Sequence, residues 1–569
     1  MFLFLHVHAQ TNIICSNPTA DQVIKGNYNP QNFLPPLIIN QPDSILNLML
    51  QQVSPDSLHA TLDMLGTFYT RNSASDTISA TTGIGAARRW AFQKFAGISA
   101  THNNRLLPSY LQFDDTSICG VLQHRDIFSV LPGADTSDKS IVIVEAHIDS
   151  RCKEVCDTVC LAQGIDDNGS GTALVLELAR VMSACVYART IVFLLNIGEE
   201  QGLNGANAFA KYAQLQGIKV HAVLNNDIVG GVFCGHTSSA PSCPGFGNID
   251  STHVRIFSSG AANSTHKQLA RFVKLEYQEE ILPLVSLPMN IMIMSAEDRT
   301  GRGGDHIPFR LHSFTAIRMT SANENGNATT ADTSYHDRQH TSDDILGLDI
   351  NPNPGLDSFF VDFNYLARNS MINATGIAMA AIGPLTPDLS VAIVGSSTVA
   401  VTITQQTQYL RYRVGVRTLS NDWDSVYSFS NQLTDTIVLP FSGNNFFSVA
   451  SVDSNGIESL FSRELVKYVV GIDDPGNAVS GIHLFPNTPN PADEQTLITI
   501  ECDRPLKNES AYLSITDANG KEVSRIPVEI HPGMNEVLYN HGFHASGIFW
   551  CTLFIDGRKT ESVKMLFVD

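Results

Sequence analysis

Imidazole and carboxylate side chains recur in this chain at spacings that suit a metal site. Catalytic zinc is held by such groups and keeps one position open for water. Two zinc ions need a carboxylate between them, and a further carboxylate that binds no metal must accept the proton of the water. The residues that could supply these groups are His147, Asp167, Glu199, Glu200, Asp227 and a later histidine, His336 or His340. The set predicts a hydrolytic metal site with one acid to spare as its base.

These residues follow apolar segments that have the length and composition of buried strands. The predicted strands are 140–146, 190–197, 220–225 and 314–319, and the predicted helices are 86–95, 171–182 and 205–216. Strands alternating with helices predict an α/β domain with a mainly parallel sheet and helices on both faces. Because sites in such sheets lie beyond the carboxyl ends of the strands, His147, Glu199 and Asp227 should meet at one edge.

Serine residues are predicted to cap two helices. Ser57 precedes an apolar stripe formed by Leu58, Leu62 and Leu65, and Ser170 precedes the helix at 171–182. Serine is favoured at this position because its hydroxyl accepts a hydrogen bond from a free backbone N–H group. We therefore expect both hydroxyls to accept such a bond.

The bulk composition excludes some classes of partner. The net charge of −20 argues against a nucleic-acid ligand, since phosphates require Lys and Arg. No segment approaches the roughly 18–20 apolar residues of a membrane-spanning helix, so we expect no transmembrane anchor. Residues 1–9 are a candidate for a truncated signal peptide, although no basic residue precedes their apolar run.

The cysteine residues indicate an oxidising compartment. Cys152, Cys156 and Cys160 form a C-x3-C-x3-C cluster, which is not a usual spacing of zinc ligands. Disulfides that pin a loop are the expected role, and such bonds persist outside the reducing cytosol. The pairing of the ten cysteines does not follow from the sequence.

The composition changes at a proline-rich join at 383–387. Beyond it, short alternating strands separated by turn residues replace the helical periodicity, as is typical of all-β sandwiches. A second join at 471–477 separates two such segments. The predicted organisation is a signal remnant at 1–9, the α/β domain at 10–383, and two all-β sandwich modules at 384–470 and 471–569.

Several motifs of the α/β part resemble those of the M28 peptidases, the dizinc aminopeptidase family, and follow the family's order. They are His147-Ile148-Asp149-Ser150, the segments 164–171 and 198–205, Asn226-Asp227, and the segments 304–309 and 340–344. The resemblance covers roughly residues 50–383 and implies a zinc exopeptidase-like fold.

Carried over residue by residue, this resemblance implies two zinc ions. The implied ligands are His147, Asp167, Glu200, Asp227 and His340, with Asp167 bridging both ions. Glu199 would be the general base for metal-activated water, and Asp149 would orient an imidazole. His336 stays open as a rival to His340. Asp305 and His306 either shape the substrate pocket or order a loop.

The two β modules resemble other known domains. Residues 388–468 resemble a fibronectin type III module. Residues 482–569 resemble the C-terminal sorting domain of the type IX (Por) secretion system, through the segments 484–487 and 489–492 and a terminal Lys564-Met565. This resemblance implies recognition by that secretion machinery, and a protein that is secreted from a Gram-negative cell or held on its surface.

These expectations together favour a secreted zinc-dependent exopeptidase that hydrolyses the N-terminal peptide bond of peptides. Within the resemblance, an M28-like carboxypeptidase and a one-zinc transferase resembling glutaminyl cyclases are alternatives. The alternative from another class is a noncatalytic surface binding protein that keeps the peptidase body as a scaffold. Cobalt or manganese would suit the same ligands, because imidazole and carboxylate bind several metals.

Overall fold

The computed structural model describes residues 10–568, apart from short gaps. The residues outside the description are 1–9, 136, 235–247, 261–263, 299–301, 323–337, 352–354, 396, 419, 440–442, 470–481, 493–494, 503, 507–509, 518–520, 542–545 and 569. The predicted signal remnant and His336 therefore lie outside the described residues. The chain divides into two compact units, the first ending at Val469 and the second formed mainly by the residues that follow.

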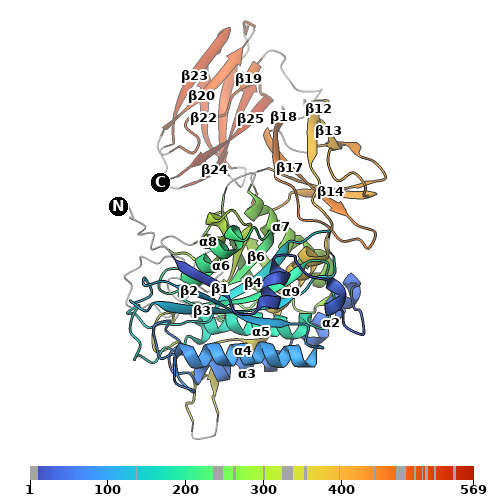
Figure 1. The fold of residues 1–569 in the computed structure, drawn as a ribbon. Coiled ribbons are helices and arrows are strands. Elements are labelled where there is room, and N and C mark those ends of the chain that lie inside the picture. The colour runs from blue at the N-terminus through green and yellow to red at the C-terminus, as the bar shows by residue number, and fades with distance from the viewer. Residues whose placement is uncertain are drawn as a thin grey trace. The chain divides into compact units, whose positions relative to one another are not determined.

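In the described part of the first unit, nine strands form one mixed sheet in the order β1-β2-β3-β5-β4-β6-β9-β7-β8 (Figure 1). Their bounds are β1 Thr11–Cys15, β2 Leu107–Asp114, β3 Gln123–Leu131, β4 Ile141–His147, β5 Thr190–Asn196, β6 Val220–Asn226, β7 His253–Ser258, β8 Asn290–Ile293 and β9 Ala316–Ser321. Strands β5, β4, β6 and β9 are parallel neighbours, whereas β1, β2 and β3 add antiparallel strands at one side. The predicted α/β fold is confirmed, and its parallel part is the buried centre of the sheet.

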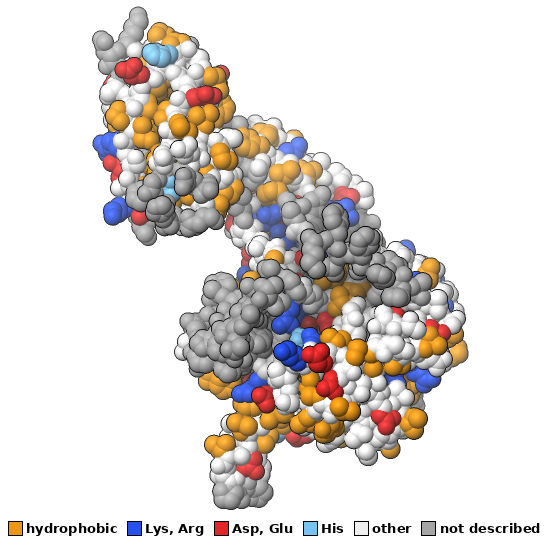
Figure 2. Space-filling model, turned by 90° about the vertical axis from the view of Figure 1, so that its left-hand side faces the viewer, with side chains coloured by type: hydrophobic (Ala, Val, Ile, Leu, Met, Phe, Trp, Pro, Cys, Tyr) orange, Lys and Arg blue, Asp and Glu red, His pale blue; other side chains and the backbone are white. Residues whose placement is uncertain are grey.

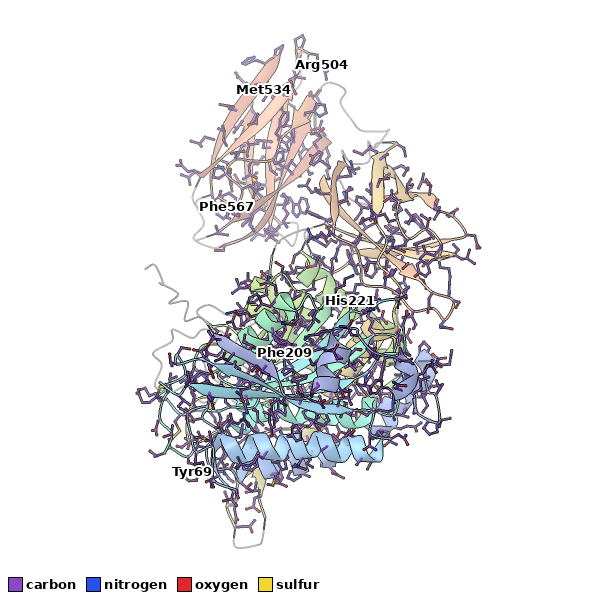
Figure 3. The ribbon with its side chains drawn as sticks, viewed as in Figure 1. Tyr69, Phe209, His221, Arg504, Met534 and Phe567 are labelled. Atoms are coloured by element: carbon purple, nitrogen blue, oxygen red, sulfur yellow. A yellow bond between two sulfur atoms is a disulfide. The ribbon has the colours of Figure 1, made fainter. Side chains whose placement is uncertain are left out.

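Helices cover both faces of this sheet. One face carries α2 (Pro42–Gln52), α3 (Pro55–Gly66), α4 (Gly83–Thr101), α5 (Gly171–Met182), α7 (Thr265–Glu276) and α9 (Phe363–Ile382), and the other carries α1 (Pro18–Ile24), α6 (Asn204–Leu215) and α8 (His306–Leu311). In Figure 1, α4 and α5 lie on the opposite side of the sheet from α6 and α8. Phe209 of α6, labelled in Figure 3, packs edge-on against Phe128 of β3, with ring centroids 5.5 Å apart. The central strands are therefore buried between two layers of helices.

Of the two predicted serine caps, Ser57 is wrong, whereas Ser170 does occupy the N-cap position of its helix without a capping hydrogen bond from its side chain. Helix α3 begins at Pro55, and its cap is Ser54, whose hydroxyl accepts a hydrogen bond from the Ser57 N–H group. Proline suits the first helical turn because its missing N–H group would have no partner there. Ser170 does precede α5, but its hydroxyl donates to the Asp166 carbonyl at 2.7 Å. The Asn168 side chain provides the hydrogen bond instead, because its Oδ1 atom accepts the Gly171 N–H group at 2.9 Å.

The chain beyond α9 forms antiparallel sheets, which confirms the predicted all-β region. Its strands are β12 Leu389–Ile393, β13 Thr398–Ile403, β14 Arg411–Arg417, β15 Ser425–Ser430, β16 Thr434–Val438, β17 Gly443–Val452, β18 Leu465–Val469, β19 Ile482–Leu484, β20 Gln495–Cys502, β21 Ala511–Asp517, β22 Glu522–Val528, β23 Gly533–Asn540, β24 Gly547–Ile555 and β25 Arg558–Phe567. Strands β12 to β18 form two sheets around one apolar core, and β19 to β25 form two sheets around another. None of the described helices has both the length and the apolar character needed to cross a membrane.

Candidate metal centre

Three neighbouring parallel strands end at one edge of the sheet and carry most of the predicted site residues. Strand β4 ends at His147, and Asp149 follows two residues later. Glu199 and Glu200 come shortly after the end of β5, and Asp227 comes directly after β6. The structure brings these segments together because the carboxyl ends of parallel strands share one edge.

Asp167 lies between two histidine side chains. Its Oδ1 atom is 3.4 Å from His147 Nε2, and its Oδ2 atom is 3.1 Å from His340 Nε2. Each imidazole also faces a second carboxylate. His147 Nε2 is 3.4 Å from Asp227 Oδ1, and His340 Nε2 is 3.2 Å from Glu200 Oε2. The five side chains therefore form two adjoining groups of ligand atoms that share Asp167.

This donor set fits divalent metal ions. Ligand atoms lie within 4.8 Å of one another in two groups, His147 with Glu199 and Asp227, and His147 with Asp167 and Glu200. Within the described part of the chain, the buried Asp227 Oδ1 and Glu200 Oε1 atoms have no hydrogen-bond partner. Burial of a carboxylate oxygen without a partner is costly, and a bound cation would remove that cost. Imidazole combined with carboxylate is also the usual ligand set of catalytic zinc.

The turn that carries Asp167 is fixed by hydrogen bonds between backbone N–H groups and carboxylate side chains. The buried Asp344 accepts the N–H groups of Asp166 at 2.9 Å and of Asp167 at 3.0 Å. Asp166 in turn accepts the N–H groups of Gly230 and Gly231 through Oδ1, each at 3.1 Å. Burial raises the pKa of Asp166 to about 7. Asp166 thus holds the turn in place, whereas its neighbour Asp167 faces the histidines.

Two buried side chains support the ligands from behind. Asp149 Oδ1 lies 3.4 Å from Nδ1 of His147, the ring nitrogen that does not face Asp167. Burial opposes the ionisation of Asp227, but Arg318, with Nη2 3.0 Å from Asp227 Oδ2, holds the pKa of that carboxyl below its usual range. Such outer partners fix the orientation of a metal ligand. Asp149 therefore lies on the side of His147 that is turned away from Asp167, and its orienting role stays a prediction.

Glu199 and Asp305 are acids of this site that have shifted pKa values. Burial raises the pKa of Glu199 well above its usual range, against the attraction of His147. Asp305 accepts a hydrogen bond from Asn196 Nδ2 at 3.0 Å, and burial raises its pKa to about 7. His306 is directed elsewhere, with Nε2 3.2 Å from the Glu297 carbonyl oxygen. A substrate-binding role for Asp305 and His306 stays a prediction.

Disulfides brace the loop that follows the first motif. Cys152 is bonded to Cys160, and Cys156 is bonded to Cys119 in the segment between β2 and β3. Cys234 is disulfide-bonded as well. The predicted role of the cysteine cluster is therefore seen in the structure, which assigns the partners of Cys119, Cys152, Cys156 and Cys160.

Arginines at the site had no role in the sequence-based expectations. Arg318 supports Asp227, and the fully buried Arg71 donates to the carbonyl oxygens of Ile148 and Gly164 at 2.7 and 2.8 Å. Arg151 directly follows the first motif, and this position in the sequence could have identified it as a residue of the site. Figure 2 shows basic, acidic and histidine side chains gathered on one face of the molecule.

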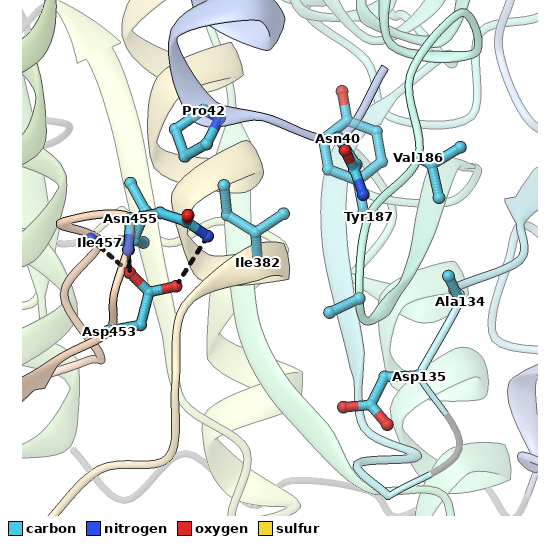
Figure 4. Close-up of a pocket in the computed structure, with 11 residues that line it drawn as sticks. Asn40, Pro42, Ala134, Asp135, Val186, Tyr187, Ile382, Asp453, Asn455 and Ile457 are labelled. Atoms are coloured by element: carbon cyan, nitrogen blue, oxygen red, sulfur yellow. Dashed lines mark hydrogen bonds between the residues drawn. The ribbon is translucent and has the colours of Figure 1, made fainter. Parts of the chain in front are cut away.

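A separate pocket of about 320 Å³ lies away from these residues (Figure 4). Asn40, Tyr187, Ile382 and Asp453 are among the residues that line it. The Asp453 carboxylate already accepts the N–H groups of the turn at 455–457, at 2.8 and 3.0 Å. Its charge is thus used to shape a turn, and the pocket offers no cluster of catalytic groups among the described residues.

Comparison with known sequences points to one peptidase family. Residues 126–351 match the model of peptidase family M28, so this part of the chain carries that family's domain. A "probable zinc metalloprotease" of Pyricularia oryzae is 31% identical over 350 residues, which are 58% of this chain and 65% of the relative. The chain therefore spans slightly less than two thirds of that relative. A "probable zinc metalloprotease" of Leptosphaeria maculans is 28% identical, with coverage of 74% and 97%.

Comparison with solved structures gives distant likenesses. The LapA aminopeptidase of Legionella pneumophila superposes with a TM-score of 0.43 and 18% identity, covering 60% of this chain and 74% of that chain. The glutaminyl cyclase of Porphyromonas gingivalis has a TM-score of 0.39 and 15% identity, covering 57% and 97%.

Proposed function

We propose that this protein is a secreted zinc exopeptidase, specifically an aminopeptidase that uses two zinc ions. The observation that carries the proposal is the position of Asp167, whose two carboxylate oxygens face one histidine each. A carboxylate placed in this way can bind two metal ions at once. The M28 match over residues 126–351 and the relatives called probable zinc metalloproteases support a zinc peptidase.

Each residue of the centre has a role in this proposal. The metal-holding residues are His147, Asp167, Glu200, Asp227 and His340. Bound zinc supplies Lewis acidity, which polarises the scissile carbonyl and makes water easier to deprotonate. Glu199 accepts the proton of the attacking water and delivers it to the leaving amine. Asp149 and Arg318 keep their partner ligands in position.

The first test measures metal content and substrate range on the full-length protein. We expect two zinc ions per chain and hydrolysis of aminoacyl p-nitroanilides with a free α-amine, lost with chelator and restored by zinc. N-acetylated p-nitroanilides should stay intact. Release of C-terminal residues instead would favour the carboxypeptidase alternative. A protein with neither metal nor turnover would favour the noncatalytic binding protein.

Asp167→Asn tests the shared ligand directly. Because both of its oxygens face a histidine, the substitution should weaken zinc binding at both positions, whereas Glu200→Gln should weaken only the position beside His340. Zinc per chain after dialysis, measured by mass spectrometry, distinguishes the two variants. An Asp167→Asn protein that still holds two ions would contradict the shared-ligand assignment.

Export through the type IX route is a separate part of the proposal. The disulfides and the separate apolar core of the second unit support it. A reporter fused to residues 470–569 should reach the medium or the surface of a Gram-negative cell that has this secretion system. A reporter that stays in the periplasm would contradict this part alone.

A further inference from the structure

A positively charged side chain lies at the candidate metal centre and has no part in the proposed reaction. Arg151 Nε is 2.7 Å from Glu200 Oε2, and Nη2 is 2.7 Å from His340 Nδ1. Nη1 donates to the carbonyl oxygens of Cys152 and Lys153 at 3.3 and 3.1 Å. These contacts use four of the five N–H groups that a guanidinium has. Arg151 is therefore held at one side of the centre.

The loop that follows Arg151 is covalently braced and leaves the side chain accessible. The Cys152–Cys160 bond closes the loop, and the Cys119–Cys156 bond ties it to the rest of the domain. The backbone of such a constrained loop loses little further freedom when a ligand binds, so the position of Arg151 on the chain is pre-organised. The side chains of Arg151 and His340 are 17% and 20% exposed.

A metal ion at His340 would change what Arg151 can bind. His340 directs Nε2 toward Asp167 and Glu200, so a metal held there would leave the proton on Nδ1. A protonated Nδ1 donates, and it cannot accept the hydrogen bond of Arg151 Nη2. A dication that shares Glu200 also weakens the attraction between this carboxylate and the guanidinium. Both effects free part of the guanidinium for another acceptor.

We propose that Arg151 is a specificity-determining residue that binds a carboxylate group of the substrate, an inference that rests on the proposed function. A guanidinium pairs with a carboxylate through two parallel hydrogen bonds. A peptide offers a carboxylate in an acidic side chain or at its C-terminus. Arg71 and Arg318 are fully buried and hold carbonyl oxygens and Asp227, so they are not placed to meet a substrate.

The test compares matched substrates of the zinc-loaded, full-length protein. Glu p-nitroanilide against Gln p-nitroanilide probes a side-chain carboxylate, and Ala-Leu against its C-terminal amide probes a terminal one. For one of the two pairs, kcat/KM should favour the acid by about tenfold or more, as expected for a charge-assisted contact. Arg151→Gln should abolish this ratio and Arg151→Lys should keep part of it. Lys153→Ala removes an exposed charge from the same loop and should leave the ratio unchanged.

Other outcomes overturn the inference. Equal kcat/KM values within both pairs, or a preference that survives in Arg151→Gln, would exclude a carboxylate anchor. Loss of zinc in both Arg151 variants would show that the residue positions Glu200 and does not bind the substrate. If the wild type hydrolyses none of these substrates, the proposed function fails. Calorimetric titration of the zinc-loaded protein with Ala-Glu and with Ala-Gln then tests the inference separately from the reaction. Equal affinities for the two peptides would refute it. Tighter binding of Ala-Glu by the wild type, lost in Arg151→Gln, would support it.

Discussion

Two carboxylates at one edge of the sheet, Asp167 and Glu199, have pKa values that are shifted in opposite directions. Burial opposes the ionisation of Asp167, but hydrogen bonds from His147 and His340 hold its pKa well below the usual range. Burial raises the pKa of Glu199 well above it. An acid that stays ionised suits a metal ligand, and one that exchanges protons suits a base. Asp167, whose two oxygens are paired with imidazoles, therefore suits the role of metal ligand, and Glu199 suits the role of base.

Glu199→Gln should abolish turnover and keep the zinc. Glutamine has nearly the same shape but cannot accept the proton, and loss of a general base costs roughly 10²–10⁴-fold in rate. The measurement is kcat together with zinc content. Glu154→Gln removes an exposed acid from the disulfide-braced loop and should change neither value. Normal turnover by Glu199→Gln would refute the assignment of the base.

At the scale of elements, the turns after the strands aim the ligands, and one glycine makes the Asp167 turn possible. Gly164 has a φ of +52°, and a Cβ there would lie 2.4 Å from the Asp167 carbonyl oxygen. The left-handed conformation costs other residues about 1–2 kcal/mol. The close approach excludes any side chain as well, so both the turn and the direction of Asp167 depend on this residue.

Gly164→Ala should therefore lower both stability and zinc binding. We expect the strain of about 1–2 kcal/mol plus a cost of about 1–3 kcal/mol for the overlap. Gly217→Ala is the matched control, because Gly217 has a φ of +66° but no atom within 4 Å of its would-be Cβ. Urea unfolding and zinc content are the readouts. Equal destabilisation by the two substitutions would show that the close approach does not matter.

Helix α7 is joined to the first β-sandwich by a buried ion pair. Arg271 Nη1 lies 2.9 Å from Glu464 Oε1, and the side chains are 2% and 1% exposed. Arg417 also pairs with Glu464, through Nη2 and Oε2 at 2.7 Å. A buried carboxylate that serves two guanidinium groups cannot lose its charge without leaving them uncompensated.

Glu464→Gln should be strongly destabilising, by about 3–5 kcal/mol, because it breaks a buried pair on one side only. Asp63→Asn is the control, since the 60% exposed Asp63 faces His59 on the surface of α3 and such pairs contribute less than about 1 kcal/mol. The free energy of unfolding in urea compares the two. A small effect of Glu464→Gln on the free energy of unfolding would mean that water solvates the two guanidinium groups once the carboxylate is lost.

At the scale of the whole molecule, the two units have separate apolar cores. The core of the second unit is built from residues after 481, and those residues pack with one another. Within the first unit, Leu275 of α7 packs with Ala450 and Phe461 of the sandwich. The sandwich at 388–469 thus covers part of the α/β body.

Two truncations should therefore behave differently. Residues 10–469 should keep the zinc content, kcat/KM and melting temperature of the α/β body, because they retain every described residue of the first unit. Residues 10–383 should melt at a lower temperature, since Leu275 and the Arg271 guanidinium lose their partners. Calorimetry and p-nitroanilide hydrolysis compare the two proteins. Equal melting temperatures would contradict the packing described for the sandwich.

Several elements were missed in the sequence for physical reasons. Strands β2 and β3, which lie between the edge strand β1 and the parallel strands, pair antiparallel, and the alternating burial of β2 gives no continuous apolar run. Helix α9 is buried almost all round, so it lacks the polar face that marks a surface helix. The helix at 171–182 and the central strands were predicted closely, because long apolar segments between polar turns have few alternatives.

The side chains that could do chemistry can be identified from the sequence alone, as can the positions of His147, Glu199 and Asp227 after buried strands. It also carried the order of motifs that resembles the M28 peptidases. Three contacts appear only once the chain is folded. Asp167 faces both His147 and His340, Asp344 holds the Asp167 turn, and Arg151 pairs with Glu200. The reason is that strand patterns are local properties of the chain. Contacts between distant loops depend on how the whole fold closes around them.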